Sequence, residues 1–289
     1  MRAEIAEVIQ IHSAAGRRFD AGGVRSFVLD RGEGPAVVCL HGVPASSFSY
    51  RKVIPVLADE GVHGFAIDFP GMGLAARPAE FDYSPQGLSR WLGEAIDALG
   101  VERCHLVVHD ISGPIAAEWA IANPERVLSF TALDTMLAPA DFRAPWMMRP
   151  FARRGLGRTW LRGTPPFLFA LLFGAVGIAD RSAISRREVL AYRELLTLGD
   201  GGRAFLRIMR SFAYTDEAQA AIARGLASCG FPARIIWGER DTAIGSDQLE
   251  VARRLLGVEP LMVDAKHFLQ EDQYRPLGQA IADLAAPLG

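Results

Sequence analysis

The sequence has few cysteines, no apolar run of membrane-spanning length and no excess of either charge. Three of its 289 residues are cysteine, at positions 39, 104 and 229, and none has CxxC spacing. This spacing predicts reduced cysteines in a cytoplasmic protein and excludes a disulfide framework. The 31 basic and 33 acidic residues give a net charge of −2 without a strongly basic stretch, so nucleic acid is not an expected partner.

Neither a secretory signal nor a transmembrane segment is expected. The first twelve residues, MRAEIAEVIQIH, include acidic residues and no apolar run. Residues 163–179 carry no charge, but this segment is shorter than the about twenty residues of a membrane span and has two prolines near its start. We therefore expect a buried or pocket-lining helix there. The alternative is a surface that dips into a membrane or meets a partner, next to Arg149, Arg153, Arg154, Arg158 and Arg162.

Short apolar, β-branched runs alternate with amphipathic helical stretches, which predicts an α/β fold with a mainly parallel sheet. The expected strands are residues 7–12, 24–30, 36–40, 63–68, 104–109, 127–133, 233–237 and 260–263. The expected helices are residues 46–58, 84–99, 113–122, 247–256 and 273–284.

The alternation stops at about residue 139 and resumes at about residue 230. The intervening stretch is rich in helical pattern, arginine and aromatic residues and shows no clear strand. We interpret it as a helical insertion that packs on the core as a lid. The predicted division is a first core segment at 1–137, a helical cap at 138–229 and a second core segment at 230–289.

The segment LVVHDISGPIAAEWA, residues 106–120, leads from an apolar strand directly into a helix and has the form of a nucleophile elbow. Such an elbow needs small residues after the nucleophile. Asp110 is followed at +2 and +3 by Ser112 and Gly113, whereas Ser112 as nucleophile would have Asp110 at −2 and Pro114 at +2. The pattern therefore favours Asp110 as the nucleophile over Ser112, and over an aspartate that only caps the helix.

Two further segments supply partners for this residue. The strand ending in CLHGVP, residues 39–44, predicts backbone N–H groups that face an oxyanion, and we expect the amides of Val43 and Ile111 to form this hole. The segment VDAKHFLQED places His267 after a late strand, where a general base is expected. The acid that orients it is expected at Asp241, in IIWGERD, with Asp134, in TALDT, as the alternative.

The segments SSFSYRKVIPVLADEGVHGFAIDFPGMGLAARP, VVHDISG and KHFLQED resemble those of haloalkane dehalogenases, with epoxide hydrolases as close cousins. The resemblance spans residues 24–136 and 230–288 and is weak in the insertion, where these enzymes carry their cap. It implies an α/β-hydrolase fold with an eight-stranded sheet and a cap after the sixth strand. By this resemblance Asp110 is the nucleophile and His267 the base, and Asp241 and Asp134 hold the acid positions of two subgroups.

Two positions depart from the dehalogenase pattern. The residue after the nucleophile is usually Trp, whose indole N–H holds the halide, and here it is Ile111. Many relatives have a polar residue after the HG pair, and here it is Val43. A halide would then need donors from the cap, with Trp146 and Trp160 as candidates. Epoxide hydrolases protonate the opening oxygen with cap tyrosines, and the candidates here are Tyr192 and Tyr214.

The expected reaction follows from the carboxylate nucleophile. A carboxylate attacks an sp³ carbon and forms an alkyl-enzyme ester, which water activated by His267 then hydrolyses. The apolar cap predicts a small, apolar organic substrate, and no motif for a cofactor or a metal is present. The leading hypothesis is an alkyl-halide hydrolase, and the alternatives are an epoxide hydrolase, a serine-type esterase through Ser112 and a non-catalytic binding protein. The sequence does not indicate an oligomeric state.

Overall fold

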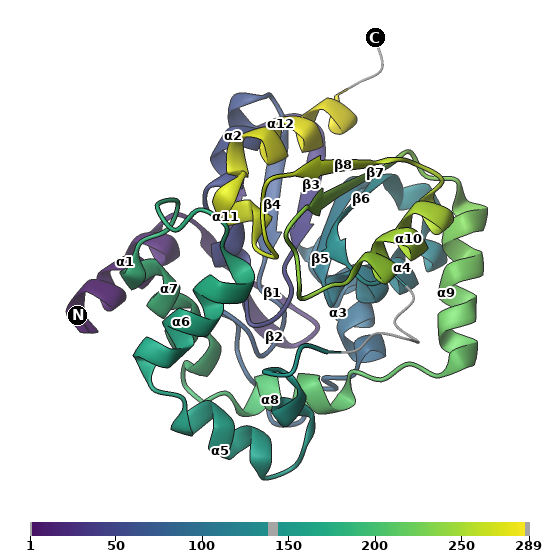
Figure 1. The fold of residues 1–289 in the computed structure, drawn as a ribbon. Helices are drawn as coiled ribbons and strands as arrows, with labels where there is room; N and C mark the ends of the chain where they lie inside the picture. The colour runs from purple at the N-terminus through teal and green to yellow at the C-terminus, as the bar shows by residue number, and fades with distance from the viewer. Residues whose placement is uncertain (1, 138–143, 287–289) are drawn as a thin grey trace.

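An eight-stranded sheet forms the centre of the computed structural model, which describes residues 2–137 and 144–286 (Figure 1). Its order is β1-β2-β4-β3-β5-β6-β7-β8. The first two pairings, β1 with β2 and β2 with β4, are antiparallel, and the others are parallel. The strands are β1 Arg17–Ala21, β2 Val24–Arg31, β3 Ala36–Leu40, β4 His63–Ile67, β5 Cys104–Asp110, β6 Val127–Thr135, β7 Ala233–Gly238 and β8 Pro260–Val263. The predicted mostly parallel sheet of eight strands is confirmed.

Helices cover both faces of this sheet. Side chains alternate between the faces along a strand, so in β3 Val38 and Leu40 pack in one hydrophobic cluster and Val37 and Cys39 in the other. The first cluster includes residues of α3 (Pro85–Ala98) and α4 (Ser112–Ala122). The second includes residues of η1 (Ser47–Tyr50), α2 (Val53–Asp59), α11 (Leu269–Asp272) and α12 (Tyr274–Ala285).

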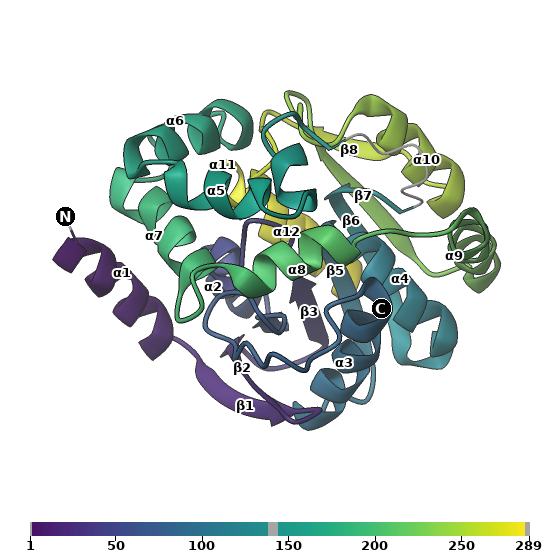
Figure 2. The ribbon, with the colours of Figure 1, turned by 90° about the horizontal axis from the view of Figure 1, so that it is seen from below.

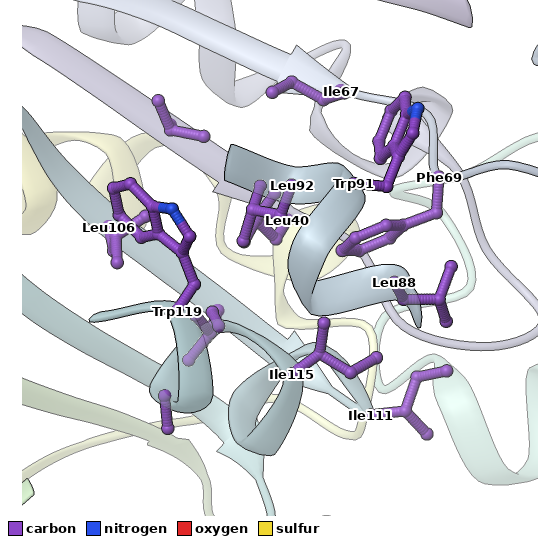
Figure 3. Packing of buried hydrophobic residues seen from close by; sticks show 14 of the residues in the cluster. Leu40, Ile67, Phe69, Leu88, Trp91, Leu92, Leu106, Ile111, Ile115 and Trp119 are labelled. Carbon is purple, nitrogen blue, oxygen red and sulfur yellow. The ribbon is translucent and has the colours of Figure 1, made fainter. Parts of the chain in front are cut away.

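Figure 3 shows the first cluster from close by. Leu40 and Leu106 come from adjacent parallel strands. Trp119 of α4 lies near Leu106, and Trp91 of α3 lies beside Phe69, with ring centroids 6.1 Å apart. Trp91 is buried and donates its indole N–H to the carbonyl of Ala21, which satisfies its polar atom. This packing fixes α4, and therefore the residue that precedes it, against the sheet.

The N-terminal prediction is wrong. Residues 7–12 were expected as a strand, and the structure has helix α1 at Arg2–Ala14. Ile5, Val8, Ile9 and His12 recur at i, i+3, i+4 and i+7, which is helical spacing. This face packs against helix α7 (Arg186–Thr197). The first strand is instead Arg17–Ala21, which was not predicted.

Between β6 and β7 the described residues, 144–229, form helices and no strand. These are η4 Arg149–Ala152, α5 Leu156–Gly163, α6 Pro166–Gly177, α7 Arg186–Thr197, α8 Arg203–Ser211 and α9 Asp216–Cys229. Helices α5 to α8 lie together beyond the carboxyl ends of the strands (Figures 1 and 2). The predicted start of the cap, residue 138, lies outside the described residues. None of the described helices is long and apolar enough to span a bilayer.

The chain returns to the sheet through β7, which is followed by α10 (Ser246–Leu256) and then β8. The short helix η2 (Pro124–Arg126) connects α4 to β6. Every candidate catalytic residue follows or ends a parallel strand. Parallel strands present their carboxyl ends at one edge of the sheet, where α/β proteins bind ligands.

Candidate active site

Asp110 ends β5 in a strained backbone conformation. Its φ is 55°, in the left-handed region that non-glycine residues rarely adopt. The pairing of β5 with β6 shifts by one residue at this point, between His109 and Asp110. This geometry is typical of a nucleophile elbow, in which a sharp turn between strand and helix presents one side chain above the sheet.

Two glycines permit this turn. A Cβ on Gly42 would lie 2.3 Å from the Cβ of Asp110, so only glycine lets the loop after β3 come so close to the carboxylate. A Cβ on Gly113 would lie 2.1 Å from Oγ1 of Thr135, so glycine also lets α4 approach β6. The small residues of the HG pair and of the D-x-S-G segment therefore have a direct steric reason.

The Asp110 carboxylate faces backbone donors. Its Oδ2 accepts a hydrogen bond from the amide of Val43 at 2.7 Å, and the amide of Ile111 also favours the charged carboxylate. Burial raises the pKa of Asp110 above its usual value, against the opposing effects of His267 and of these two amides. The structure thus brings both predicted oxyanion donors to the predicted nucleophile.

Ser112 is turned away from this site. Its Oγ donates to the carbonyls of His109 at 2.7 Å and Leu40 at 3.0 Å, and it accepts from the His109 amide at 2.8 Å. The side chain is fully buried and does not line the pocket. Its contacts tie the elbow to the neighbouring strand, which is a structural role.

His267 and Asp241 form a buried pair beside Asp110. Nδ1 of His267 lies 3.0 Å from Oδ2 of Asp241, and the Asp241 side chain is fully buried. The other Asp241 oxygen accepts from the amide of Ala243 at 2.6 Å. Burial alone would lower the pKa of His267, but the carboxylates of Asp241 and Asp110 raise it to about 9. The imidazole is therefore held charged and oriented in the free protein.

Asp134, the alternative acid, lies in the same cluster. It has a φ of 32°, is fully buried, and its Oδ1 accepts from the amide of Gly238 at 2.8 Å. One ligand-type atom from each of Asp134, Asp241 and His267 falls within 4.8 Å of the others. Burial and the adjacent Asp241 carboxylate raise the pKa of Asp134 well above its usual range. This shift favours the protonated form of Asp134, whose Oδ2 has no hydrogen-bond partner among the described residues, while Asp241 pairs with His267.

Asp134, Asp241 and His267 also carry atoms of the kind that bind metal ions. Nδ1 of His267 is already directed at Asp241, however, which is the contact expected of a base and its orienting acid.

Sequence reasoning missed His109, which precedes the candidate nucleophile Asp110. Its ring packs on that of His267, with centroids 4.6 Å apart, and its Nε2 lies 2.9 Å from the carbonyl oxygen of His267. Burial lowers the pKa of His109 well below its usual value, so the ring is neutral and Nε2 is the donor. His109 therefore fixes the loop that carries His267. The sequence signal that could have indicated His109 is its position next to Asp110 in VVHDISG.

A cavity of about 280 Å³ opens above these residues. Asp110, Ile111, Val43 and His267 form its floor. Cap side chains form its walls, and most of them are apolar: Met147, Met148, Phe151, Leu161, Leu172, Phe173, Val176 and Phe212. The polar lining outside the floor comes from Trp160, Thr164, Arg149 and Arg193. Such a cavity suits a small, largely apolar molecule.

The cap candidates separate into one at the pocket and three away from it. Trp160 lines the cavity. Trp146 is 62% exposed, does not line it, and packs edge-on against Trp160. Tyr192 is buried and donates its hydroxyl to Oε1 of Glu271 at 2.6 Å. The hydroxyl of Tyr214 is buried without a hydrogen-bond partner, and neither tyrosine lines the cavity.

Tyr192 instead belongs to a buried network that joins the cap to the core. Glu271, which follows His267 by four residues, is fully buried and pairs with Arg51 and with Nζ of Lys52, the latter at 2.7 Å. Arg51 also pairs with Glu188 of α7 at 2.8 Å. A buried carboxylate is stable only when it is paired in this way. The network fixes α7 against the loop that carries the candidate base.

The strained elbow, the two facing amides and the His–Asp pair have the arrangement that is typical of an α/β-fold hydrolase active site. Residues 35–274 match the model of the α/β hydrolase fold family. The chain therefore belongs to this family.

Individual relatives support the same placement. Haloalkane dehalogenase 2 of Mycobacterium tuberculosis is 28% identical over 285 residues, which cover 95% of this chain and 96% of that protein. Bifunctional epoxide hydrolase 2 of the mouse is 31% identical over 159 residues, or 55% of this chain and 27% of that protein. The crystal structure of wild-type Cfl2 from Burkholderia cenocepacia superposes with a TM-score of 0.80 at 23% identity, covering 94% and 95% of the two chains.

Proposed function

We propose that the protein hydrolyses small apolar alkyl halides through an ester on Asp110. The observation that carries this proposal is the contrast between two neighbouring side chains. The Asp110 carboxylate lines the cavity and contacts the Val43 amide, whereas the Ser112 hydroxyl is bound to backbone atoms beneath it. This contrast favours a carboxylate nucleophile over a serine-type esterase.

In the first step an Asp110 oxygen attacks the carbon that bears the halogen. The carbon–halogen bond breaks, the halide leaves with the bonding electrons, and an alkyl ester forms on Asp110. No proton needs to be removed for this attack. The halide requires a donor, and Trp160 is the indole that lines the cavity.

In the second step His267 takes a proton from water as the oxygen attacks the ester carbonyl of Asp110. The negative charge that develops on the former carboxylate oxygen is stabilised by the amides of Val43 and Ile111, which face that group. Collapse of the intermediate releases the alcohol and restores the Asp110 carboxylate. Ester formation also removes the charge of Asp110, one of the groups that raise the pKa of His267 after Asp241. The pKa of the imidazole therefore falls, which favours the neutral form that must act as a base.

Epoxide hydrolysis is the second candidate, and the residues next to the nucleophile favour it. Ile111 and Val43 offer no side-chain donor for a departing halide. An epoxide oxygen remains attached to the substrate, but it too needs a proton donor. The hydroxyls of Tyr192 and Tyr214 do not reach the cavity, so that donor would have to be Trp160, Thr164 or an arginine of the lining.

Product analysis with matched substrates distinguishes the two reactions. The protein is incubated with 1-bromobutane and, separately, with 1,2-epoxybutane, and bromide and diol are measured. We expect bromide release, slower with the chloride analogue because chloride is the poorer leaving group. Diol formation without bromide release would assign the epoxide reaction, and release of acid from a butyrate ester alone would contradict the carboxylate nucleophile.

A further inference from the structure

The part of the cap next to the cavity has an unusual charge distribution. Between residues 144 and 179 the sequence has five arginines and no acidic residue, although the whole chain has a net charge of −2. All five side chains are exposed. None of them forms an ion pair with a described carboxylate, whereas arginines elsewhere do, such as Arg253 with Glu259. The five are Arg149, Arg153, Arg154, Arg158 and Arg162.

Exposed apolar side chains occupy the same region. Phe167 is 63% exposed and Leu171 56%, and with Ala175 they follow one another at four-residue intervals along α6. Trp146 is 62% and Leu156 48% exposed. These four large side chains are half of the large hydrophobic residues that are exposed in the described part of the chain, so the apolar surface is concentrated here.

Helix α6 is apolar on both of its faces. Phe169, Leu172, Phe173 and Val176 point inward and line the cavity, while Phe167 and Leu171 face solvent. A helix on the surface of a soluble domain normally has polar residues on its outer face. α5 and α6 lie at the outside of the molecule, away from the sheet (Figures 1 and 2). The need to line the cavity explains the inner face of α6 and does not explain the outer face.

We propose that this surface, the α5–α6 face, docks on a membrane rich in anionic lipid. The face consists of Trp146, Arg153, Arg154, Leu156, Arg158, Phe167 and Leu171. Helices that lie in a membrane interface combine basic residues with Trp, Phe and Leu in this way, and anionic headgroups supply the negative charge that the arginines lack within the protein. None of the described helices spans the bilayer, so the contact is peripheral.

The charge of the face argues against its use as a contact between two copies of the chain. A symmetric dimer places the same surface patch of each copy against the other. The exposed arginines of the two copies would then face each other without a carboxylate between them, which is repulsive. A lipid surface instead offers negative charge and an apolar layer together.

The position of the cavity suggests how membrane contact could serve substrate binding. The cavity lies on the inner side of α6, so the helix that meets the lipid is also a wall of the substrate site. An apolar substrate that dissolves in the membrane would be released next to its binding site. This consequence depends on the proposed function, whereas the membrane contact itself does not.

Co-sedimentation of the full chain with lipid vesicles tests the proposal. The protein is mixed with vesicles of phosphatidylcholine alone or of phosphatidylcholine with phosphatidylglycerol, and the bound fraction is measured at low and high salt. We expect binding to the anionic vesicles, weakened by salt. The triple variant Arg153→Gln, Arg154→Gln, Arg158→Gln should lower the partition coefficient about 100-fold, from about five-fold per arginine near a charged surface.

The apolar half of the face is tested separately by the double variant Phe167→Ser, Leu171→Ser, which should also weaken binding. The matched control is Arg25→Gln, Arg31→Gln, Arg254→Gln, which removes the same charge from three exposed arginines outside the cap and should bind as the unmodified chain does. Circular dichroism melting checks that every variant is folded.

Three results would overturn the proposal. The first is equal binding, or no binding, to vesicles with and without the anionic lipid. The second is a control variant that loses as much binding as the triple variant, since the contact would then be unspecific. The third is a dimer in analytical ultracentrifugation that Phe167→Ser, Leu171→Ser dissociates while vesicles fail to bind, because a second copy of the chain would then cover the face.

Discussion

Replacing Asp241 by asparagine should slow hydrolysis of the ester far more than its formation. The substituted amide keeps the shape of the side chain but loses the charge that holds His267 in its orientation and raises its pKa. In catalytic triads this change typically costs roughly 10³- to 10⁴-fold in turnover, or about 4–5 kcal/mol of activation free energy. His267 is only 5% exposed, so water cannot replace the lost partner. The nearby Asp134 carboxyl is the one group in the cluster that can do so in part.

The matched variant is Asp134→Asn. Because Asp134 is favoured in its protonated form beside Asp241, an amide that donates a hydrogen bond is a close substitute, and we expect less than about a ten-fold loss. Asp134→Asn added to Asp241→Asn should remove the residual activity, since neither candidate acid would then remain to orient the imidazole.

Quenched-flow measurements with an alkyl bromide separate the two steps. Asp241→Asn should give a burst of bromide close to one equivalent per active site, followed by a slow steady state, because attack by Asp110 does not need the base. If Asp134→Asn is the more damaging variant, Asp134 is the acid. If Asp241→Asn abolishes the burst, Asp241 acts on the nucleophile and the assignment of His267 to the second step alone is wrong.

Further predictions concern the base, two residues of the cavity lining and the buried network. The rate of ester hydrolysis should rise with pH, because His267 must be neutral to accept a proton. The rise should level off at a pKa below the value of about 9 in the free protein, since the ester lacks the Asp110 charge. A single-turnover rate that falls between about pH 7 and about pH 9 would contradict this prediction. Ile111→Trp should raise the rate of bromide release if the ring fits the cavity. Trp160→Phe should lower this rate roughly 10- to 1000-fold, because it removes a donor to the halide. Efficient chloride release by Trp160→Phe would show that other lining residues hold the halide. In a denaturant titration, Tyr192→Phe should lower the free energy of unfolding by about 1.5–3 kcal/mol, because buried Glu271 loses a donor. The control Tyr274→Phe removes a hydroxyl bound to exposed Arg275 and should change the free energy of unfolding little.

Most of the sheet was predictable because its strands are short apolar runs, which in central strands such as β3 and β5 are buried on both faces. Residues 36–40 and 260–263 were predicted with the bounds that β3 and β8 have, and five other strands differ from the prediction by one or two residues at their ends. A continuous apolar run bounded by turn residues is a clear signal for such a strand. The prediction for the N-terminal segment was wrong because its few apolar residues fit an alternating pattern as well as a helical one. Its packing partner, α7, also lies far away in sequence.

The candidate site divides in the same way. Asp110, Val43, Ile111, Asp241 and His267 come together as expected because each follows a parallel strand, so strand order alone places them at one edge of the sheet. No comparable rule predicts where the side chains of the cap residues lie. Tyr192 is directed at Glu271, 79 residues away in sequence, and no local pattern indicates that a buried carboxylate takes its hydroxyl. Trp146 and Trp160 differ in exposure only because of how the cap helices pack.

The central claim is that Asp110 is the nucleophile, and trapping the ester tests it most directly. The His267→Gln variant is incubated with an alkyl bromide, digested, and the peptide that contains Asp110 is analysed by mass spectrometry. The variant lacks the base of the second step, so an alkyl group should remain on Asp110, while Asp110→Asn in the same background should show none. An adduct on Ser112, or bromide release without any adduct on Asp110, would contradict the account.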